Sequence, residues 1–393
     1  MSRVAPENDP FRLEVRAWLR TNVPTNWRAA VTGVAPHDFV RFQREWFAKV
    51  VEGGYANAHW GSEWPGGGRS IGEQAVIFQE MARNDAPRLI LHFVALYHTA
   101  MTLQEWGTEA QCKRHLPAIL KGEVWCQGFS EPNAGSDLAS LRTSAVRKGD
   151  RYIVNGQKIW STMGQHADWC LLLARTSTTG PKQAGITYLL MDMRSKGLKI
   201  RPITQITGDE EFSEVFLDDV EIPVENRLGD ENDGWRVTQT TLSSERGITI
   251  LELTERMDRS MWRLVEALGA AGLADDQFRR AAVMVQIRVR ALRSAIARFL
   301  MDSHTATALG QSSLIKLLYA DLLRSYTQLG LSARGLEGQF WKPLTLGAGY
   351  ETSNWMFDFM NSYVWTIAGG TNEIQRNIIA ERTLGMPREL RGL

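Results

Sequence analysis

Cysteine is scarce in this chain of 393 residues, which contains three of them. Cys112, Cys126 and Cys170 are too few for a disulfide framework, and none stands in the C-x-x-C spacing of many metal and redox sites. The seven histidines are scattered, and His92 and His98 lie six positions apart, which puts them off a shared helical face. We therefore expect a protein of a reducing compartment with no metal site.

An excess of charge of either sign is absent as well. The 45 lysines and arginines are balanced by 44 aspartates and glutamates, and the formal net charge is +1. This balance argues against nucleic acid or an anionic membrane as the main partner. The first residues contain no apolar signal core, and the longest apolar run, Leu89 to Met101, is interrupted by two histidines. The sequence predicts a cytoplasmic protein in which this run forms a buried helix.

Three common nucleotide and hydrolase motifs are missing. No G-x-G-x-x-G follows a strand pattern, and neither G-x-x-x-x-G-K-[ST] nor G-x-S-x-G occurs, so a Rossmann domain, a P-loop and a serine hydrolase lose their main support. Tryptophan, in contrast, is abundant. The fourteen tryptophans exceed what packing requires at this length, and the surplus fits flat ligands or broad subunit contacts.

Hydrophobic spacing divides the chain into three predicted domains. Helical periodicity covers residues 1–122, alternating strand patterns cover residues 123–232, and helical periodicity returns over residues 233–393. A chain of this length is too long for one small core. The order of elements is therefore helices, then a β domain, then helices again, which predicts an α+β fold.

Local signals place individual elements within these domains. Ser70-Ile71-Gly72-Glu73 is a capping box that predicts the start of a helix. Residues 169–174 and 186–191 are predicted strands, and Asn155-Gly156 predicts a tight hairpin turn. For the glycine-rich stretch 64–68, a flexible turn is favoured over a ligand contact.

The segment 126–138 is the most informative part of the sequence. It combines a turn former with small residues and the hydroxyls of Ser130 and Ser136, and such a segment lets backbone N–H groups line up toward one anion. An oxygen-rich, negatively charged cofactor is the ligand that this chemistry favours. The alternative is an ordinary β-turn capped by Asp137.

A second informative segment, 366–376, has a glycine pair that runs into a predicted helix. Gly369 and Gly370 permit close backbone approach, and Thr371 is the predicted N-cap, so that this helix start can receive cofactor oxygens. The alternative is a plain helix start without a ligand.

Three segments, SEPNAGSD (130–137), NGQKIWST (155–162) and GTNEIQR (370–376), resemble the motifs of the acyl-CoA dehydrogenase family. They occur in the family's order, and the resemblance spans nearly the whole chain. It implies an N-terminal helical domain, a middle β-barrel or sandwich domain and a C-terminal four-helix bundle. It also implies FAD as cofactor, an acyl-CoA substrate, an electron-transfer flavoprotein as acceptor, and a homo- or heterotetramer or a dimer.

The resemblance also implies which residues bind FAD. In the family, a tryptophan and a threonine flank the flavin ring, where an indole covers the ring and a hydroxyl meets N5 or O4. For Trp160 the alternative is a plain core residue at a strand end. The residues implied as FAD contacts are Gln127, Phe129, Ser130, Gly135, Ser136, Trp160, Ser161, Thr162, Gly370, Thr371 and Glu373, and Ser136 is also implied in substrate binding.

The catalytic base is not at its most common family position. Many members carry a glutamate immediately before the Gly-Thr of the last motif, where this chain has Gly369. Other members carry the base before an arginine near the start of the C-terminal domain, a position that Glu245 and Arg246 match here. The resemblance thus implies Glu245 as the base, Arg246 as a substrate contact, and the backbone N–H of Gly369 as a donor to the thioester carbonyl.

A helix would place the Glu245 carboxyl beside an apolar strip of Leu242 and Ile248, and partial desolvation would raise its pKa to a useful value. The alternatives are a solvated surface glutamate or a structural partner of Arg246 or Arg256. Removal of the α-proton by this base, with hydride transfer from the neighbouring carbon to flavin N5, would convert an acyl-CoA to the trans-2-enoyl-CoA.

One family element, which reaches the FAD of a neighbouring subunit, is missing, and a second is matched poorly. Residues 270–280 lack Arg-x-Phe-Gly, and residues 327–331 match Gln-Ile-Phe-Gly-Gly poorly. A bacterial branch that lacks them includes mixed tetramers, so a non-catalytic or half-site partner subunit is a second hypothesis beside a catalytic dehydrogenase. A flavin oxidase is a third. Branched, long-chain and steroid acyl groups all remain open as substrates.

Overall fold

The computed structural model describes residues 5–244, 249–272, 274–302, 308–340 and 354–387. The chain forms two compact units. Unit 1 consists of Met1–Gly33, Arg69–Arg88 and Arg246–Leu393, and unit 2 consists of Val34–Gly68 and Leu89–Glu245. The predicted order of helices, sheet and helices is confirmed. The three domain boundaries drawn from the sequence stay a prediction.

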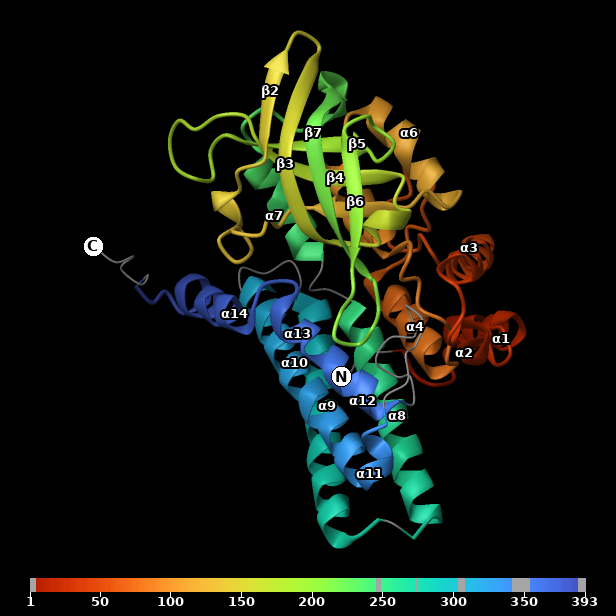
Figure 1. The fold of residues 1–393 in the computed structure, drawn as a ribbon. Helices are drawn as coiled ribbons and strands as arrows, with labels where there is room; N and C mark the ends of the chain where they lie inside the picture. Colours follow the sequence, from red (N-terminus) through yellow and green to blue (C-terminus); the bar gives the residue numbers. More distant parts are fainter. Residues whose placement is uncertain (1–4, 245–248, 273, 303–307, 341–353, 388–393) are drawn as a thin grey trace. The chain divides into compact units, whose positions relative to one another are not determined.

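Unit 2 is built on one eight-stranded sheet, with strand order β6-β7-β3-β2-β4-β5-β8 and β1 paired in parallel with β4. The long strands β3 and β7 run side by side in Figure 1. One hydrophobic core of this unit consists of buried side chains that come mostly from the strands, among them Tyr152, Leu172 and Val215. The strands are β1 (Trp125–Gly128), β2 (Ser144–Lys148), β3 (Arg151–Thr162), β4 (Trp169–Arg175), β5 (Ile186–Asp192), β6 (Leu198–Ile203), β7 (Phe212–Pro223) and β8 (Arg227–Leu228).

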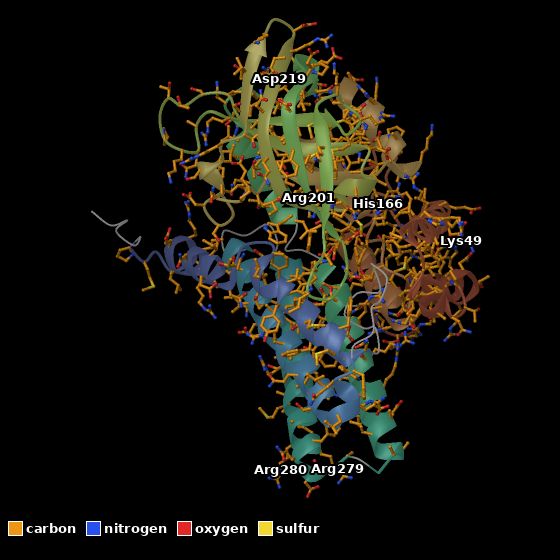
Figure 2. The ribbon with its side chains drawn as sticks, in the orientation of Figure 1. Lys49, His166, Arg201, Asp219, Arg279 and Arg280 are labelled. Atoms are coloured by element: carbon orange, nitrogen blue, oxygen red, sulfur yellow. The ribbon has the colours of Figure 1, made fainter. Side chains whose placement is uncertain are left out.

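The predicted hairpin turn at Asn155-Gly156 is wrong. Both residues lie inside β3, and the turn between β2 and β3 is made instead at Gly149, whose φ is +62°. The pairing of β3 with β7 shifts at Gly156, and Asn155 exchanges two 2.8 Å hydrogen bonds with Asp219, which Figure 2 labels. A Cβ at position 156 would lie 2.7 Å from the Cα of Thr143, so the glycine serves a bulge and a close approach.

Helices of unit 2 pack on and beside this sheet. α7 contacts β5 and α5, and the hydroxyl of Thr241 lies 2.9 Å from that of Thr102 and 3.0 Å from that of Tyr188. The α-helices of this unit are α3 (Pro36–Glu52), α5 (Ala100–Trp106), α6 (Glu109–Leu120) and α7 (Gly234–Ser244). Three short helical turns, η2 (Leu138–Ser140), η3 (Gly164–His166) and η4 (Val224–Asn226), lie in connections between strands.

The apolar run from Leu89 becomes regular only at the π-helix η1 (Val94–Thr99), which continues into α5. The carbonyl oxygen of Leu96 accepts from His59 Nε2 at 3.0 Å and from Trp60 Nε1 at 3.3 Å. A π-helical turn disturbs the regular ladder in this way and frees a carbonyl for side chains. Burial lowers the pKa of His59 and of His98 to about 4, so both imidazoles are neutral at pH 7.

Unit 1 is a helical bundle in which α8, α9 and α10 pack side by side (Figure 1). Its core includes Met257, Val289 and Tyr319, all fully buried. The predicted capping box at Ser70 is present, with both reciprocal hydrogen bonds to Glu73. The helices are α1 (Pro10–Asn22), α2 (Trp27–Val31), α4 (Ile71–Arg83), α8 (Thr249–Ala270), α9 (Asp276–Asp302), α10 (Ala308–Ala333), α11 (Gly335–Gly338), α12 (Trp355–Ser362), α13 (Val364–Ile367), α14 (Asn372–Ile378) and the π-helix η5 (Ile379–Thr383).

Ion pairs to two buried carboxylates, Glu80 and Glu255, join the helices of unit 1. Arg12 on α1 is fully buried and donates to Glu80 on α4 at 2.8 Å. Glu255 on α8 lies 3.3 Å from Arg83 on α4 and 2.8 Å from Arg293 on α9. Since an unpaired buried charge is costly, separating these helices would leave the carboxylates of Glu80 and Glu255 without their partners. Over the described part of the chain, no helix combines the length and the apolar character of a membrane span.

Candidate active site

The first motif forms the connection between β1 and β2 in unit 2. Gln127 and Gly128 are the last two residues of β1. The ring of Phe129, which follows them, is buried and lies nearly perpendicular to the ring of Tyr188, with 5.8 Å between the ring centroids. The carbonyl of Ser130 accepts from the backbone N–H of Ile159 at 2.9 Å. The first two predicted segments therefore lie next to each other.

The outer part of the same connection is open to solvent. Gly135 and Ser136 are exposed, and a Cβ at Gly135 would meet nothing within 4 Å. Glu131 and Ala134 exchange two backbone hydrogen bonds of 3.1 and 3.0 Å, which form the narrow base of this turn. The side-chain oxygen of Asp137 accepts from Lys182 at 2.8 Å, a contact between two half-exposed groups.

A buried pair of charges holds this connection, and sequence reasoning missed it. Lys158 on β3 is fully buried, and its Nζ donates to the carbonyl of Phe129 at 3.1 Å and to Glu131 Oε1 at 2.9 Å. The Glu131 carboxylate also accepts the backbone N–H groups of Arg142 and Thr143 at 2.7 and 2.8 Å. The Glu131 carboxylate, near the start of the connection between β1 and β2, thus hydrogen-bonds to the backbone at the end of that connection.

The pKa directions of the pair follow from these contacts. Burial alone would raise the pKa of Glu131, but the Lys158 ammonium and the hydrogen bonds hold it below its usual value. Burial lowers the pKa of Lys158 although Glu131 opposes this. The signal in the sequence was a lysine inside NGQKIWST and a glutamate inside SEPNAGSD, two charged residues in segments otherwise made of small and apolar side chains.

Trp160 is not a core residue. The pairing of β3 with β7 shifts between Lys158 and Ser161, and Trp160 takes a left-handed conformation with φ +63°. Its indole is 54% exposed and lies nearly perpendicular to the ring of Phe212, with 6.0 Å between the ring centroids. A bulky residue in this region of the Ramachandran plot is strained, and such strain clusters at ligand sites. The exposure of this indole is compatible with its covering a flat ligand.

Several buried polar atoms of the motifs have no partner among the described residues. They are Gln127 Nε2 and Ser161 Oγ in unit 2 and Gln375 Oε1 in unit 1. Buried polar groups are normally hydrogen-bonded, so each of these atoms requires an explanation. A cofactor with carbonyl, hydroxyl and phosphate oxygens offers hydrogen-bond partners for Gln127 Nε2 and Ser161 Oγ, and these residues of unit 2 therefore fit FAD. Thr162, the other hydroxyl of this segment, is half-buried at the end of β3.

The glycine-rich motif lies in unit 1. Gly369 and Gly370 have φ values of +66° and +86°, and Thr371 caps α14 by accepting from the N–H of Ile374 at 3.3 Å, as predicted. Glu373 points into solvent beside Arg376. The backbone at both glycines takes a conformation that side-chain-bearing residues adopt only with strain.

Glu245 and Arg246 lie outside the described residues, and their predicted roles stay predictions. The described end of α7 at Ser244 and the described start of α8 at Thr249 bracket them. Arg256, named as a partner for Glu245 in one alternative, donates to Glu252 at 2.6 Å and to the carbonyl of Ala86 at 2.7 Å.

Comparison with protein families agrees with the motifs over almost the whole chain. Residues 5–123 match the N-terminal domain of acyl-CoA dehydrogenases, residues 126–220 the middle domain and residues 232–384 the C-terminal domain. The chain belongs to the acyl-CoA dehydrogenase family. It is accordingly an oxidoreductase of the acyl-CoA dehydrogenase type.

Individual members of the acyl-CoA dehydrogenase family are similar over their full length. Acyl-CoA dehydrogenase IpdE1 of Mycolicibacterium smegmatis is 38% identical over 402 residues, which cover 98% of this chain and all of the relative. The solved structure of the Tcur3481-Tcur3483 steroid ACAD superposes with a TM-score of 0.86 at 30% identity, covering 99% of this chain and 100% of that one. The crystal structure of the ChsE4-ChsE5 complex from Mycobacterium tuberculosis superposes with a TM-score of 0.82 at 27% identity, covering 98% of this chain and 99% of that one.

Proposed function

We propose that this chain is a catalytic FAD-dependent dehydrogenase that converts an acyl-CoA thioester to the trans-2-enoyl-CoA. The observation that carries the proposal is the full-length match to an acyl-CoA dehydrogenase at 38% identity. The unpartnered buried atoms Gln127 Nε2 and Ser161 Oγ support FAD as the cofactor. When bound, FAD supplies the acceptor for the hydride that leaves the β-carbon.

In this proposal the chain's own groups handle the proton and the carbonyl oxygen. Glu245 takes the proton from the α-carbon, and the N–H of Gly369 donates to the thioester carbonyl oxygen as negative charge develops there. A backbone donor does not depend on the side chain, so a glycine at position 369 is compatible with this role. Arg246 contacts the substrate, and Trp160, Ser161 and Thr162 orient the flavin ring.

The matched substitution Glu245→Gln tests the base. It keeps the size of the side chain but removes the proton acceptor, so we expect FAD to stay bound and the rate of flavin reduction by substrate to fall by about 10²- to 10⁴-fold. Stopped-flow absorbance of the FAD-loaded protein under anaerobic conditions measures this rate. Glu266→Gln on the exposed side of α8 is the control and should reduce its flavin at the wild-type rate. Wild-type flavin reduction in Glu245→Gln would refute the assignment.

We further propose a bulky acyl group, of the steroid-derived class, as the substrate. The similarity to a structure described as a steroid ACAD supports this choice among the branched, long-chain and steroid thioesters. Under the same proposal an electron-transfer flavoprotein takes the electrons, and the protein works in the cytoplasm. Comparing flavin bleaching by steroid-type, branched and straight long-chain acyl-CoA thioesters tests the substrate. Faster bleaching by a straight-chain thioester would contradict it.

A half-site partner subunit is the second candidate function. The missing Arg-x-Phe-Gly element at residues 270–280 favours it, and two similar structures carry paired names, Tcur3481-Tcur3483 and ChsE4-ChsE5. In that case a second chain type would complete the FAD site. Purification of this chain alone separates the two candidates, since a yellow, FAD-loaded protein supports the catalytic one and a colourless protein supports the partner role. Rapid oxidation of the reduced protein by oxygen would point to an oxidase instead.

A further inference from the structure

Two buried side chains contact the turn at Gly369 and Gly370 from the same side. Lys316 on α10 is 4% exposed, and its Nζ donates to the carbonyl oxygen of Gly370 at 2.8 Å and to Asn372 Oδ1 at 3.1 Å. Gln375 on α14 is fully buried, and its Nε2 donates to the carbonyl of Gly369 at 2.7 Å and to that of Gly370 at 3.4 Å. Both carbonyl groups therefore converge on one amide nitrogen.

This convergence fixes where the neighbouring N–H groups point. A trans peptide is planar, and its N–H is directed opposite to its C=O. The N–H groups of Gly370 and Thr371 belong to the two peptides whose carbonyls face Gln375, so both donors are directed to the other side of the turn. Neither donor has an acceptor within the described part of the chain. Positive φ values at both glycines make this arrangement accessible.

The contacts also leave little freedom at position 370. A Cβ there would lie 2.7 Å from Gln375 Nε2, so the amide packs directly against the turn. Lys316 adds a buried positive charge on the carbonyl side, and hydrogen bonds from charged donors are shorter and stronger than neutral ones. In a medium of low dielectric, such a donor polarises the peptide that it contacts and strengthens its N–H as a donor.

We propose that Lys316 and Gln375 are positioning residues that aim the N–H groups of Gly370 and Thr371 at an oxygen atom of a bound ligand. The inference rests on the dehydrogenase function proposed above, which provides two oxygens of the same chemistry. One is a phosphate or ribityl oxygen of FAD, and the other is the thioester carbonyl oxygen. Donors held in place before the ligand arrives stabilise negative charge on such an oxygen without reorganisation.

Substitutions at the two side chains test the proposal in the full-length protein. Lys316→Met and Gln375→Met keep much of the side-chain volume but remove the donors. The affinity for FAD is measured by titrating apoprotein and following flavin fluorescence, and the affinity for an enoyl-CoA product is measured on FAD-loaded protein from the change in the flavin spectrum. Lys113→Met on α6 is the control for the loss of one cation, because Lys113 is exposed and pairs only with Glu109 among the described residues. Circular dichroism and thermal melts monitor folding.

We expect at least one affinity to fall by about tenfold in each variant, the effect of about one charge-assisted hydrogen bond, with no change in Lys113→Met. A loss confined to FAD identifies the cofactor as the ligand of the two N–H groups, and a loss confined to the enoyl-CoA identifies the thioester. Folded variants with wild-type affinity for both would overturn the proposal. If both variants fail to fold, the pair serves stability and the proposal is also overturned.

The proposed function and this inference fail in different ways. A wild-type protein that binds neither FAD nor enoyl-CoA contradicts the proposed function and removes the inference with it. A wild-type protein that binds both, with variants that bind equally well, contradicts the inference alone.

Discussion

Lys158 and Glu131 place one positive and one negative side chain inside unit 2, close to the segment implied in FAD binding. The pair is stable there because each charge faces the other at 2.9 Å and because Glu131 accepts two backbone N–H groups besides. Removing one member of such a pair leaves the other charge buried without compensation, which costs more than the pair itself contributes.

The variant Lys158→Met should therefore lose about 3 kcal/mol of unfolding free energy, measured by urea denaturation monitored through tryptophan fluorescence. The double variant Lys158→Met/Glu131→Gln should lose less than the sum of the two single variants, because it removes both charges. Lys182→Met is the control, since Lys182 and Asp137 are both half exposed and such a pair contributes less than about 1 kcal/mol. Additive losses in the double variant would show that the two charges are not coupled.

Single residues also show what the sequence allows one to predict. Thr371 as the cap of α14 and Ser70 as the first residue of a capping box depend on contacts within three or four positions, and both are confirmed. The hydrogen-bond partners of Lys158 and Lys316, Glu131 and the carbonyl of Gly370, lie 27 and 54 positions away in the sequence. The sequence marks Lys158 as a charged residue inside a motif, but no local pattern shows which residue pairs with it or with Lys316, so both pairings are visible only in the folded chain.

At the scale of elements, β4 and β5 were predictable from their continuous apolar runs and the long helices from their regular helical spacing, whereas β1, β2, β6 and β8 were not predicted individually. β4 and β5 are buried along nearly their whole length, and α8, α9 and α10 keep helical spacing over many turns. The prediction of a turn at Asn155-Gly156 was wrong because the dipeptide that suits a hairpin turn also suits a β-bulge. Only the pairing with the partner strand β7 distinguishes the two.

The bulge at Gly156 gives a test at this scale. In Gly156→Ala the new Cβ would lie 2.5 to 2.8 Å from atoms of Thr143, so we expect a loss of about 2 kcal/mol in unfolding free energy. The same substitution at Gly269, near the end of α8, meets nothing within 4 Å and should stabilise the protein by about 0.5 kcal/mol or more. Chemical denaturation of both variants measures the two changes. Equal stability of Gly156→Ala and wild type would contradict the close approach at the bulge.

At the scale of the whole molecule, the three motifs divide between the two units. The segments 130–137 and 155–162 are neighbours in unit 2, joined by the hydrogen bond from Ile159 to Ser130, whereas the glycine turn belongs to unit 1. Family membership, shown by matches along 98% of the chain, is a property of all three together. It could be predicted because three separated motifs in a fixed order are far more specific than any one of them.

The identity of the base and the choice between a catalytic chain and a partner subunit follow less directly from the sequence. Gly369 shows that the carboxylate is absent from one family position, but it does not by itself select Glu245. The proposed reaction requires both a proton acceptor and a donor to the carbonyl oxygen, and a sequence pattern alone does not identify which side chain is the acceptor.

We propose that this chain by itself oxidises an acyl-CoA thioester with bound FAD. The most direct test of this proposal is to mix the protein, purified without any partner and loaded with FAD, with a steroid-type acyl-CoA in the absence of oxygen, and to follow the flavin absorbance and the mass of the thioester. We expect the yellow colour to bleach, with one thioester per flavin becoming two hydrogen atoms lighter. A protein that binds FAD but neither bleaches nor changes the mass of any acyl-CoA offered would contradict the account.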